Sequence, residues 1–275
     1  MIVTFIGGGN MAGALIAGLT RKGWANDAIH VVEIDAAARH RLEHDLKVHV
    51  HDDLQAGVAP SDCVVLAVKP QQLQEVARKL GQSVCDKLVI TIAAGIRHDD
   101  LSRWLGGHRR LVRAMPNTPA LALAGVTGLY APAAISPADR DAAASILGVA
   151  GMTLWFEREA QLDSVTAVSG SGPAYVLYFI EALQEAAAGL GFESEAARTL
   201  ALETFAGTVK LATESQDSAA VLRARVTSKG GTTERAIAEL DRSGVKAAIG
   251  RAVAAAETRS RELGDALGRD EMRSD

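Results

Sequence analysis

The sequence lacks blocks of like charge, cysteine clusters and long apolar runs, and each absence excludes a class of protein. Its 29 basic and 33 acidic residues give a formal net charge of -4. No basic patch stands out, so neither a nucleic-acid partner nor an anionic membrane surface is expected. The two cysteines, Cys63 and Cys85, form no metal-type cluster. We expect no metal site, and unpaired thiols in a reducing compartment.

The apolar segments are too short for a membrane protein. The longest strongly apolar run, AYVLYFI at 174–180, is far below the length that spans a bilayer. A strand-like run begins at residue 2, which leaves no room for a signal peptide. We therefore expect a soluble, cytoplasmic protein.

The first part of the chain alternates short apolar runs with helical patterns. Strand-like runs lie at 2–6, 29–34, 63–68, 88–93 and 111–115, and further candidates for the sheet edge lie at 125–130 and 152–157. The first five are almost continuously apolar, as in parallel strands buried on both faces. Helical segments such as 11–23 and 71–81 lie between strands. Repeated βαβ units predict an α/β fold, with a Rossmann-type doubly wound sheet domain over residues 1–158.

The second part, residues 159–275, has a helical pattern and no strand pattern. The segment at 174–191 is apolar around nearly its whole circumference, which predicts a helix buried on all sides. Apolar residues from Val245 to Ala256 fall at helical spacing. A helical unit this small cannot cover such a helix alone. We therefore expect an all-α dimerisation domain that finds part of its cover on a partner subunit.

A glycine-rich segment, IGGGNMAGA at 6–14, follows the first predicted strand and opens a predicted helix. Gly7 allows a tight turn, Gly9 allows backbone N–H groups to approach a pyrophosphate, and Ala12 allows close helix–strand packing. The N-terminus of the following helix favours negative phosphates, so Asn10 and Met11 are also candidate cofactor-binding residues. The alternative is a tight turn with no ligand, but the three further βα repeats favour dinucleotide binding.

Glu33 lies at the end of the second predicted strand, where this fold reads the adenosine ribose. A carboxylate there suits the two ribose hydroxyls of NAD and repels the 2′-phosphate of NADP. Arg39 and Arg41 lie just downstream and could serve a 2′-phosphate, although a solvated helix face explains them more simply. The expected cofactor is NAD(P)H, with a preference for NADH.

Six motifs together resemble those of pyrroline-5-carboxylate reductases. They are GGGNMA at 7–12, AVKP at 67–70, AAG at 93–95, RAMPNTP at 113–119, SGSGPAY at 169–175 and TSKGGTT at 227–233. They span essentially the whole chain in the family's order. The resemblance implies reduction of a cyclic imine, 1-pyrroline-5-carboxylate, to L-proline by a nicotinamide cofactor. It also implies at least a homodimer, with a decamer of dimers as a larger assembly.

The middle motifs have a physical interpretation as a cofactor site. Ala67, Val68, Lys69 and Pro70, like Ala93, Ala94 and Gly95, follow the carboxyl ends of predicted strands, where ligands of such sheets bind. For Lys69 we expect the backbone at the cofactor and a solvated ammonium. Asn117 can offer its amide to the ribose or nicotinamide, and a loop cap is an equal alternative for this side chain. We interpret SGSGPAY as a helix entry that packs at the subunit contact.

A second glycine-containing turn near the C-terminus predicts a site for a small carboxylate. The N–H groups around Gly230 and Gly231, the hydroxyls of Ser228, Thr232 and Thr233, and a helix N-terminus would form an anion nest. The segment lacks the P-loop arrangement, so a second nucleotide is not expected. A helix cap and turn remains the alternative.

The resemblance implies roles for particular residues in substrate binding. The Thr233 hydroxyl would hydrogen-bond the ring nitrogen, and Glu159 would lie near the substrate, unless it is only a surface carboxylate. This chain departs from the family at Lys229, where many members have proline. It departs again at 51–53, where His-Asp-Asp replaces an asparagine near the adenosine phosphate.

Two other functions compete with this interpretation. A hydroxyacid dehydrogenase would use a lysine on a central helix, and the helix predicted at 174–191 has none. A catalytically silent nucleotide-binding regulator would leave the intact GGTT segment unexplained.

Overall fold

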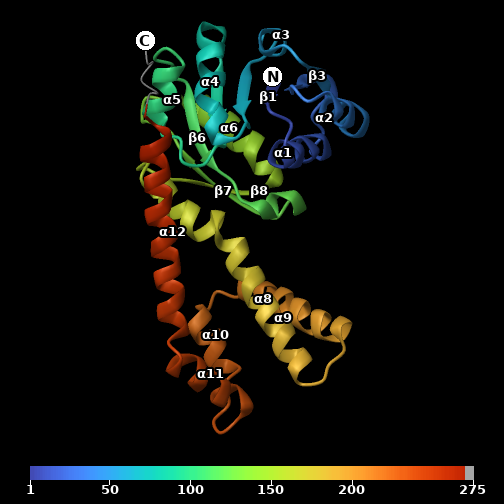
Figure 1. The fold of residues 1–275 in the computed structure, drawn as a ribbon, viewed down its shortest axis with the longest axis vertical. Helices are drawn as coiled ribbons and strands as arrows, with labels where there is room; N and C mark the ends of the chain where they lie inside the picture. The colour runs from blue at the N-terminus through green and yellow to red at the C-terminus, as the bar shows by residue number, and fades with distance from the viewer. Residues whose placement is uncertain (270–275) are drawn as a thin grey trace. The chain divides into compact units, whose positions relative to one another are not determined.

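The computed structural model describes residues 1–269 and divides the chain into two compact units. Among the described residues, the first unit comprises 1–171 and 256–269, and the second is Gly172–Ala255. Figure 1 shows both units along the chain. The division of the chain into sequence domains at 158/159 stays a prediction.

The first unit is built on one eight-stranded sheet. Its strands are β1 (Val3–Ile6), β2 (Ile29–Val32), β3 (His49–His51), β4 (Cys63–Leu66), β5 (Leu88–Thr91), β6 (Leu111–Met115), β7 (Gly125–Tyr130) and β8 (Gly151–Trp155). Their order is β3-β2-β1-β4-β5-β6-β7-β8. The pairs from β3 to β6 are parallel, β7 is antiparallel to β6, and β8 is parallel to β7. The predicted doubly wound sheet is confirmed, as are the two further strands, β7 and β8, at one side of it.

The apolar runs form strands because both faces of the central sheet are covered. In β4, Cys63 and Val65 join one core cluster, and Val64 and Leu66 join the other. Helices α1 (Asn10–Arg21) and α6 (Pro137–Leu147) contribute to the first cluster, while α4 (Pro70–Leu80) and α5 (His98–Trp104) contribute to the second. Continuous apolarity therefore reports burial on two faces.

Several strands end earlier than their apolar runs. The second, third and fourth runs continue two residues past β2, β4 and β5. These extra residues lie beyond the last ladder positions, at the edge where the chain turns towards the next helix. Of these residues Ala93 is still buried, whereas Ile34 at the end of the second run is 82 % exposed.

Strand β3 has no apolar run to predict it. It comprises only His49, Val50 and His51, and it pairs with β2. The connecting helices α2 (Ala36–Arg41) and α3 (Leu54–Val58) are also short, and each begins at an aspartate N-cap, Asp35 or Asp53. Three-residue strands at a sheet edge depend on pairing with the neighbouring strand, which local composition does not report.

The second unit, Gly172–Ala255, consists of helices joined by short turns and contains no strand, as predicted. Its helices are α8 (Gly172–Gly189), α9 (Ser194–Glu214), α10 (Ala219–Arg225), α11 (Thr232–Arg242) and the first part of α12 (Val245–Leu267). Helix α8 packs against α9. Pro173 lies in the first turn of α8, where a missing N–H costs nothing.

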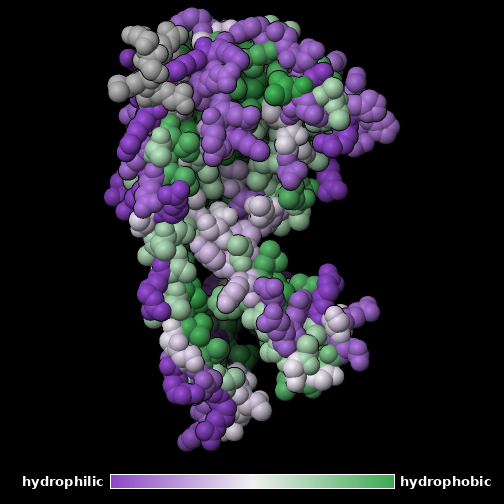
Figure 2. All heavy atoms as spheres, in the orientation of Figure 1, coloured by the Kyte–Doolittle hydropathy of each residue, from purple (hydrophilic) through white to green (hydrophobic). Residues whose placement is uncertain are grey.

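Helix α8 is not buried on all sides within this chain. None of its residues is fully buried, and Leu177 and Tyr178 are 62 % and 69 % exposed. Figure 2 shows apolar side chains at the surface of the second unit. The second unit is too small to cover a helix that is apolar all round.

No helix among residues 1–269 is long and apolar enough to cross a membrane.

Candidate functional site

The first glycine segment forms a turn in which Gly7, Gly8 and Gly9 have different surroundings. Gly7 has a positive φ of 98°, and a Cβ there would lie 3.0 Å from the Ala67 carbonyl oxygen. At Gly8 a Cβ would collide with the Leu42 side chain. A Cβ at Gly9 would meet nothing within 4 Å, and the backbone of Gly9 is extended. Protein packing therefore explains the first two glycines, while the third leaves open space for a ligand.

Helix α1 begins directly behind this turn, with Gly9 as its N-cap. Within the described chain no side chain caps this helix end, so the first N–H groups, including those of Asn10 and Met11, keep their capacity to bind an anion. Aligned peptide dipoles add a positive potential at this point. An uncapped helix start behind an open glycine fits a pyrophosphate.

Glu33 follows β2 and lies beside the glycine turn. One carboxylate oxygen accepts a hydrogen bond from the Gly8 N–H at 2.8 Å, and the other accepts from the Asp35 N–H at 3.0 Å. The side chain is therefore fixed at the carboxyl edge of the sheet, where a ribose is read in this fold.

Arg39 differs from a solvated helix residue. Its Nη1 atom donates to the backbone oxygens of Glu33 and Ile34 at 2.8 and 2.9 Å. Its side chain is 24 % exposed, whereas Arg41 is exposed. The simple interpretation as a solvated face is thus wrong for Arg39, because the guanidinium satisfies two carbonyl groups at the end of β2.

Two further segments lie past the carboxyl ends of β4 and β5. Ala67 and Val68 are partly buried, Lys69 is the exposed N-cap of α4, and Pro70 occupies the first turn of that helix. Gly95 is buried with φ of 76°, and a Cβ there would lie 3.4 Å from Leu263 of α12. Close packing of α12 accounts for the glycine at 95, and the sequence carried no signal for this contact.

Ala93 and Ala94 precede Gly95 at the same edge. Ala93 is buried and Ala94 is partly exposed. The Ala93 N–H donates to the Thr91 hydroxyl at 3.3 Å. Small side chains therefore line the carboxyl edge at β5, and their role at a cofactor stays a prediction.

Asn117 joins three segments that are distant in sequence. Its amide donates to the Ser169 carbonyl oxygen at 3.1 Å, and its side-chain oxygen accepts from the Val126 N–H at 2.9 Å. The residue is 9 % exposed. In this conformation its amide groups hold the loop after β6 against β7 and the SGSG segment.

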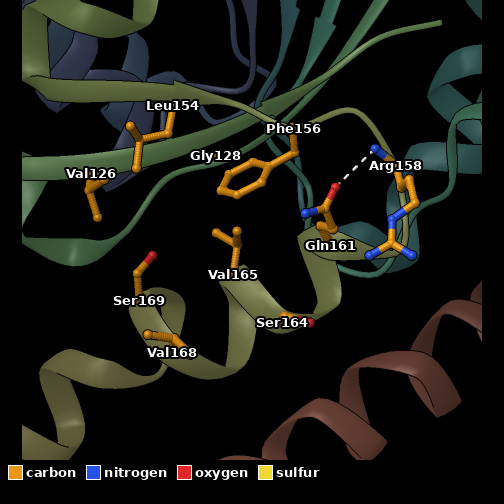
Figure 3. A pocket seen from close by; sticks show the side chains of 10 residues that line it. All are labelled: Val126, Gly128, Leu154, Phe156, Arg158, Gln161, Ser164, Val165, Val168 and Ser169. Atoms are coloured by element: carbon orange, nitrogen blue, oxygen red, sulfur yellow. Dashed lines mark hydrogen bonds between the residues drawn. The ribbon is translucent and has the colours of Figure 1, made fainter.

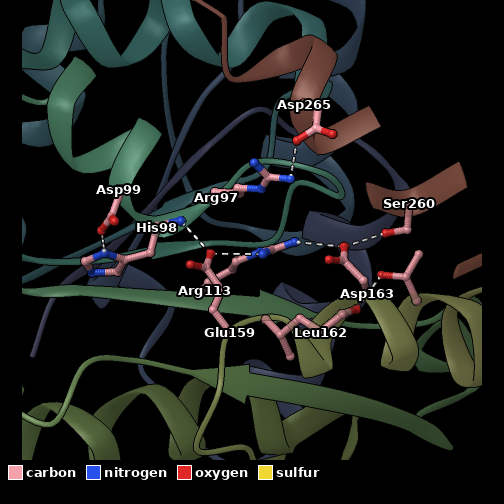
Figure 4. Close-up of polar contacts among 10 residues, drawn as sticks. Arg97, His98, Asp99, Arg113, Glu159, Leu162, Asp163, Ser260 and Asp265 are labelled. Carbon is pink, nitrogen blue, oxygen red and sulfur yellow. Dashed lines mark hydrogen bonds and ion pairs between the residues drawn. The ribbon is translucent and has the colours of Figure 1, made fainter. Parts of the chain in front are cut away.

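Glu159 lies in a buried polar network (Figure 4). Its Oε1 atom accepts from Arg113 Nη1 at 2.9 Å and from the His98 N–H at 2.6 Å. Arg113 is 4 % exposed, and its other nitrogen lies 3.9 Å from Asp163. Asp163 in turn accepts from the Ser260 hydroxyl of α12 at 2.7 Å. Glu159 therefore neutralises a buried guanidinium, in contrast to a free surface carboxylate.

Tyr130 lies at the end of β7 near this network. Its pKa is raised, first by burial and then by the negative charges of Glu159 and Asp99, so the phenol stays neutral. The His98 ring meets the Tyr130 ring edge-on at 6.2 Å. The His98 Nε2 atom is buried without a hydrogen-bond partner in the described structure. Sequence reasoning missed these two residues, which no local motif marks.

A cavity of about 470 Å³ opens between β7, β8 and the helical segment of α7 (Gln161–Val165) and η6 (Thr166–Gly170). Figure 3 shows its apolar lining, which includes Val126, Phe156 and Val165. The Ser169 hydroxyl also lies at this cavity and is buried without a partner within residues 1–269.

Among the described residues, no group of three or more His, Cys, Asp or Glu side chains is arranged to hold a metal ion.

The second glycine turn lies in the second unit. Gly230 has φ of 75°, and its N–H donates to the Glu234 carboxylate at 2.7 Å. Gly231 is the N-cap of α11, which no side chain caps in the described structure. A Cβ at Gly231 would lie 2.6 Å from the Ser228 hydroxyl oxygen. The turn and the helix start lie where the sequence predicts them, and the binding of an anion there stays a prediction.

The hydroxyl-bearing residues of this turn occupy the helix start. Thr232 and Thr233 are the first two residues of α11, with Thr232 exposed and Thr233 partly buried. The Gly231 N–H closes the turn by donating to the Ser228 carbonyl oxygen at 3.1 Å. This backbone bond and the bond to the Glu234 carboxylate close the turn without either threonine hydroxyl.

Comparisons with known proteins cover almost the whole chain. Residues 159–263 match the family described as pyrroline-5-carboxylate reductase dimerisation, and residues 2–95 match that described as NADP oxidoreductase coenzyme F420-dependent. A pyrroline-5-carboxylate reductase of Pseudomonas aeruginosa is 42 % identical over 97 % of this chain and 98 % of its own.

Solved structures agree with these matches. A pyrroline-5-carboxylate reductase from Coxiella burnetii is 39 % identical, with a TM-score of 0.90 over 95 % of this chain and 97 % of its own. The Plasmodium falciparum enzyme with NADP bound is 26 % identical, with a TM-score of 0.85 over 96 % of this chain and 98 % of its own. On this near-complete coverage, the chain belongs to the pyrroline-5-carboxylate reductase family.

Proposed function

We propose that this protein is an NAD(P)H-dependent pyrroline-5-carboxylate reductase, an oxidoreductase that acts on a C=N bond. It reduces the cyclic imine 1-pyrroline-5-carboxylate to L-proline, the last step of proline biosynthesis. The observation that carries this proposal is the family membership over nearly the full length. It is supported by the open glycine turn that directly precedes the uncapped start of α1.

The first unit would hold the dinucleotide. Gly7 and Gly9 shape the turn, and the N–H groups at Asn10 and Met11 face the pyrophosphate. Ala67–Pro70 and Ala93–Gly95 form the carboxyl edge along which the cofactor lies, with Asn117 holding the adjacent loop in place. When bound, the nicotinamide supplies the hydride.

The second glycine turn would bind the substrate carboxylate. The N–H groups of Gly230, Gly231, Thr232 and Thr233 lie at a helix start, where negative charge is stabilised. Ser228 contributes a hydroxyl beside Gly231. In the present conformation the Gly230 N–H donates to Glu234 and the Gly231 N–H donates to the Ser228 carbonyl oxygen, so a carboxylate bound by these two groups would replace existing acceptors.

Chemistry at the substrate would need few side chains. A protonated imine is a strong electrophile, so alignment of donor and acceptor is the main requirement. The Thr233 hydroxyl would hydrogen-bond the ring nitrogen and fix the ring. Glu159 would act near the substrate through its negative charge, although its Oε1 atom already serves Arg113.

NADH is the proposed preferred cofactor. The fixed carboxylate of Glu33 accepts hydrogen bonds from ribose hydroxyls and repels a 2′-phosphate. Replacing Glu33 with Ser should raise the use of NADPH relative to NADH. An unchanged ratio of kcat/KM values for the two cofactors would show that Glu33 does not read the ribose.

The assembly is proposed to be at least a homodimer built through the helical domain, with rings of dimers as larger forms. The exposed apolar residues of α8 support this proposal.

A reducing cytoplasmic setting suits the two free cysteines, of which Cys85 is exposed.

A spectrophotometric assay tests the function. Purified protein with pyrroline-5-carboxylate should oxidise NADH or NADPH at 340 nm and yield proline, with no loss of activity in EDTA. Absence of turnover with both cofactors would refute the assignment. Loss in EDTA that zinc restores would refute a metal-free mechanism.

A further inference from the structure

The carboxyl ends of β2 and β3 carry one guanidinium among several carboxylates. Glu33 follows β2, Asp52 follows β3, and Arg39 lies between these two strand ends. The strands are parallel neighbours, so their carboxyl ends share one edge. In a Rossmann sheet this edge reads the 2′ position of the adenosine ribose.

Arg39 is positioned there as a potential phosphate ligand. Two backbone carbonyls hold its Nη1 atom, which fixes the plane of the guanidinium next to Glu33. Guanidinium groups bind phosphate well because of their fixed donor geometry and permanent charge. Taken alone, Arg39 would favour a cofactor with a 2′-phosphate.

Asp52 opposes this effect. Its carboxylate lies 3.9 Å from Arg39 Nη2, and its side chain is 77 % exposed, so it pairs with the guanidinium without being packed into the core. The neighbouring Asp53, rather than Asp52, caps α3 by accepting the Ala56 N–H at 2.7 Å. The pairing with Arg39 is therefore separable from the local fold.

We propose that Asp52 is a second determinant of cofactor choice, which acts by neutralising Arg39 and so lowers the affinity for NADPH. A 2′-phosphate carries about -1.5 to -2 charges near neutral pH. Such a group must compete with Asp52 for Arg39, while the 2′-hydroxyl of NADH has no such competitor. This inference rests on the proposed binding of a nicotinamide dinucleotide.

The test compares dissociation constants of NADH and NADPH by isothermal titration calorimetry without substrate. Asp52→Asn should tighten NADPH binding about two- to fivefold, the range of an exposed ion pair, and leave NADH within about twofold. The gain should shrink at high salt. In an Arg39→Met background, Asp52→Asn should bring no gain, because the guanidinium that it frees is absent.

Asp86→Asn is the matched control. Asp86 is 79 % exposed and also lies 3.9 Å from a partly buried cation, Lys87, but it precedes β5 at the opposite edge of the sheet. It should change neither affinity. An unchanged ratio of the NADPH and NADH dissociation constants in Asp52→Asn would overturn the proposal. A gain in NADPH affinity that persists in the Arg39→Met background would overturn it as well.

Failure of the proposed function gives a different result. If the unmodified protein bound neither dinucleotide, the cofactor assignment would fail and this inference with it. If both bound but pyrroline-5-carboxylate were not reduced, the substrate assignment alone would fail, and the ratio would still test Asp52.

Discussion

At the residue scale, Thr233 separates a substrate role from a capping role. Gly231 is the N-cap of α11 and no side chain in the described structure caps it, so the Thr233 hydroxyl is not needed to start the helix. Thr233→Ala should therefore lower kcat/KM about tenfold, the effect of losing one well-placed hydrogen bond. Cofactor affinity and melting temperature should stay nearly unchanged.

The Thr233→Ser variant is the control, because it keeps the hydroxyl and should retain most activity. Kinetics and thermal melting on the same two variants decide the matter. An Ala variant that melts early and catalyses normally would leave Thr233 a structural residue, and the substrate contact would have to be sought elsewhere.

Glu159 is the second residue whose role can be measured directly. Glu159→Gln removes the charge that faces Arg113, which is 4 % exposed. Losing one partner of a buried pair costs roughly 3–5 kcal/mol. Asp163 remains 3.9 Å from the guanidinium, so we expect a smaller loss of about 2 kcal/mol in the free energy of unfolding.

Urea denaturation measures this loss, with Glu157→Gln as the control. Glu157 is exposed two residues earlier and its variant should lie within about 0.5 kcal/mol of the unmodified protein. Unchanged stability with a raised KM for the imine would instead show that Glu159 serves the substrate alone.

At the element scale, a histidine cluster makes the attachment of β3 sensitive to pH. His30 of β2 lies 2.9 Å from a ring nitrogen of His51, and its ring centroid is 4.8 Å from that of His49. The pKa of His30 is lowered by burial first, then by His49 and His51, while Asp27 opposes the shift. Folding therefore favours the neutral ring.

The direction in which stability changes with pH follows from proton binding. Because the folded pKa lies below the usual value near 6.5, the unfolded chain binds more protons in this range. The stabilisation is present above about pH 6.5 and is lost as pH falls through the folded pKa. The urea midpoint should be lower at pH 5.5 than at pH 7.5.

His30→Asn should reduce this pH dependence, whatever its effect on stability at pH 7.5. His44→Asn is the matched control, since His44 is 78 % exposed and lies outside the cluster. It should follow the unmodified protein at both pH values. Equal pH dependence in His30→Asn and the unmodified protein would contradict the prediction.

At the scale of the whole molecule, the second unit should drive association. Burial of an exposed apolar side chain contributes about 25 cal/mol per Å², and several such residues lie on α8. Leu177→Glu places a charge on this surface and should shift a dimer towards monomer at micromolar concentration. Light scattering of the purified protein measures the change.

Leu121→Glu is the control, because Leu121 is exposed to nearly the same extent, 58 % against 62 %, but lies in the first unit. Its mass should match that of the unmodified protein. A fully active monomer of the unmodified protein would refute the assembly.

Local pattern predicted much of this protein. Five apolar runs marked the central strands, because parallel strands buried on both faces are apolar at nearly every position. Gly7 was predictable because a tight turn requires a positive φ there. The helix starts at Asn10 and Thr232 followed glycine, and Pro70 and Pro173 lie in first turns.

Tertiary structure decided which distant side chains meet. Ser260 bonds Asp163, Asn117 bonds the Ser169 carbonyl, and Leu263 covers Gly95, across separations that no periodicity records. Strand β3 forms because its backbone pairs with that of β2. A sequence pattern reports the environment of a segment, such as burial or a required φ, whereas a contact depends on where two segments end after the whole chain has packed. For that physical reason the sequence by itself determined the central strands and the two glycine turns, and only the tertiary structure added β3 and placed Arg39 between Glu33 and Asp52.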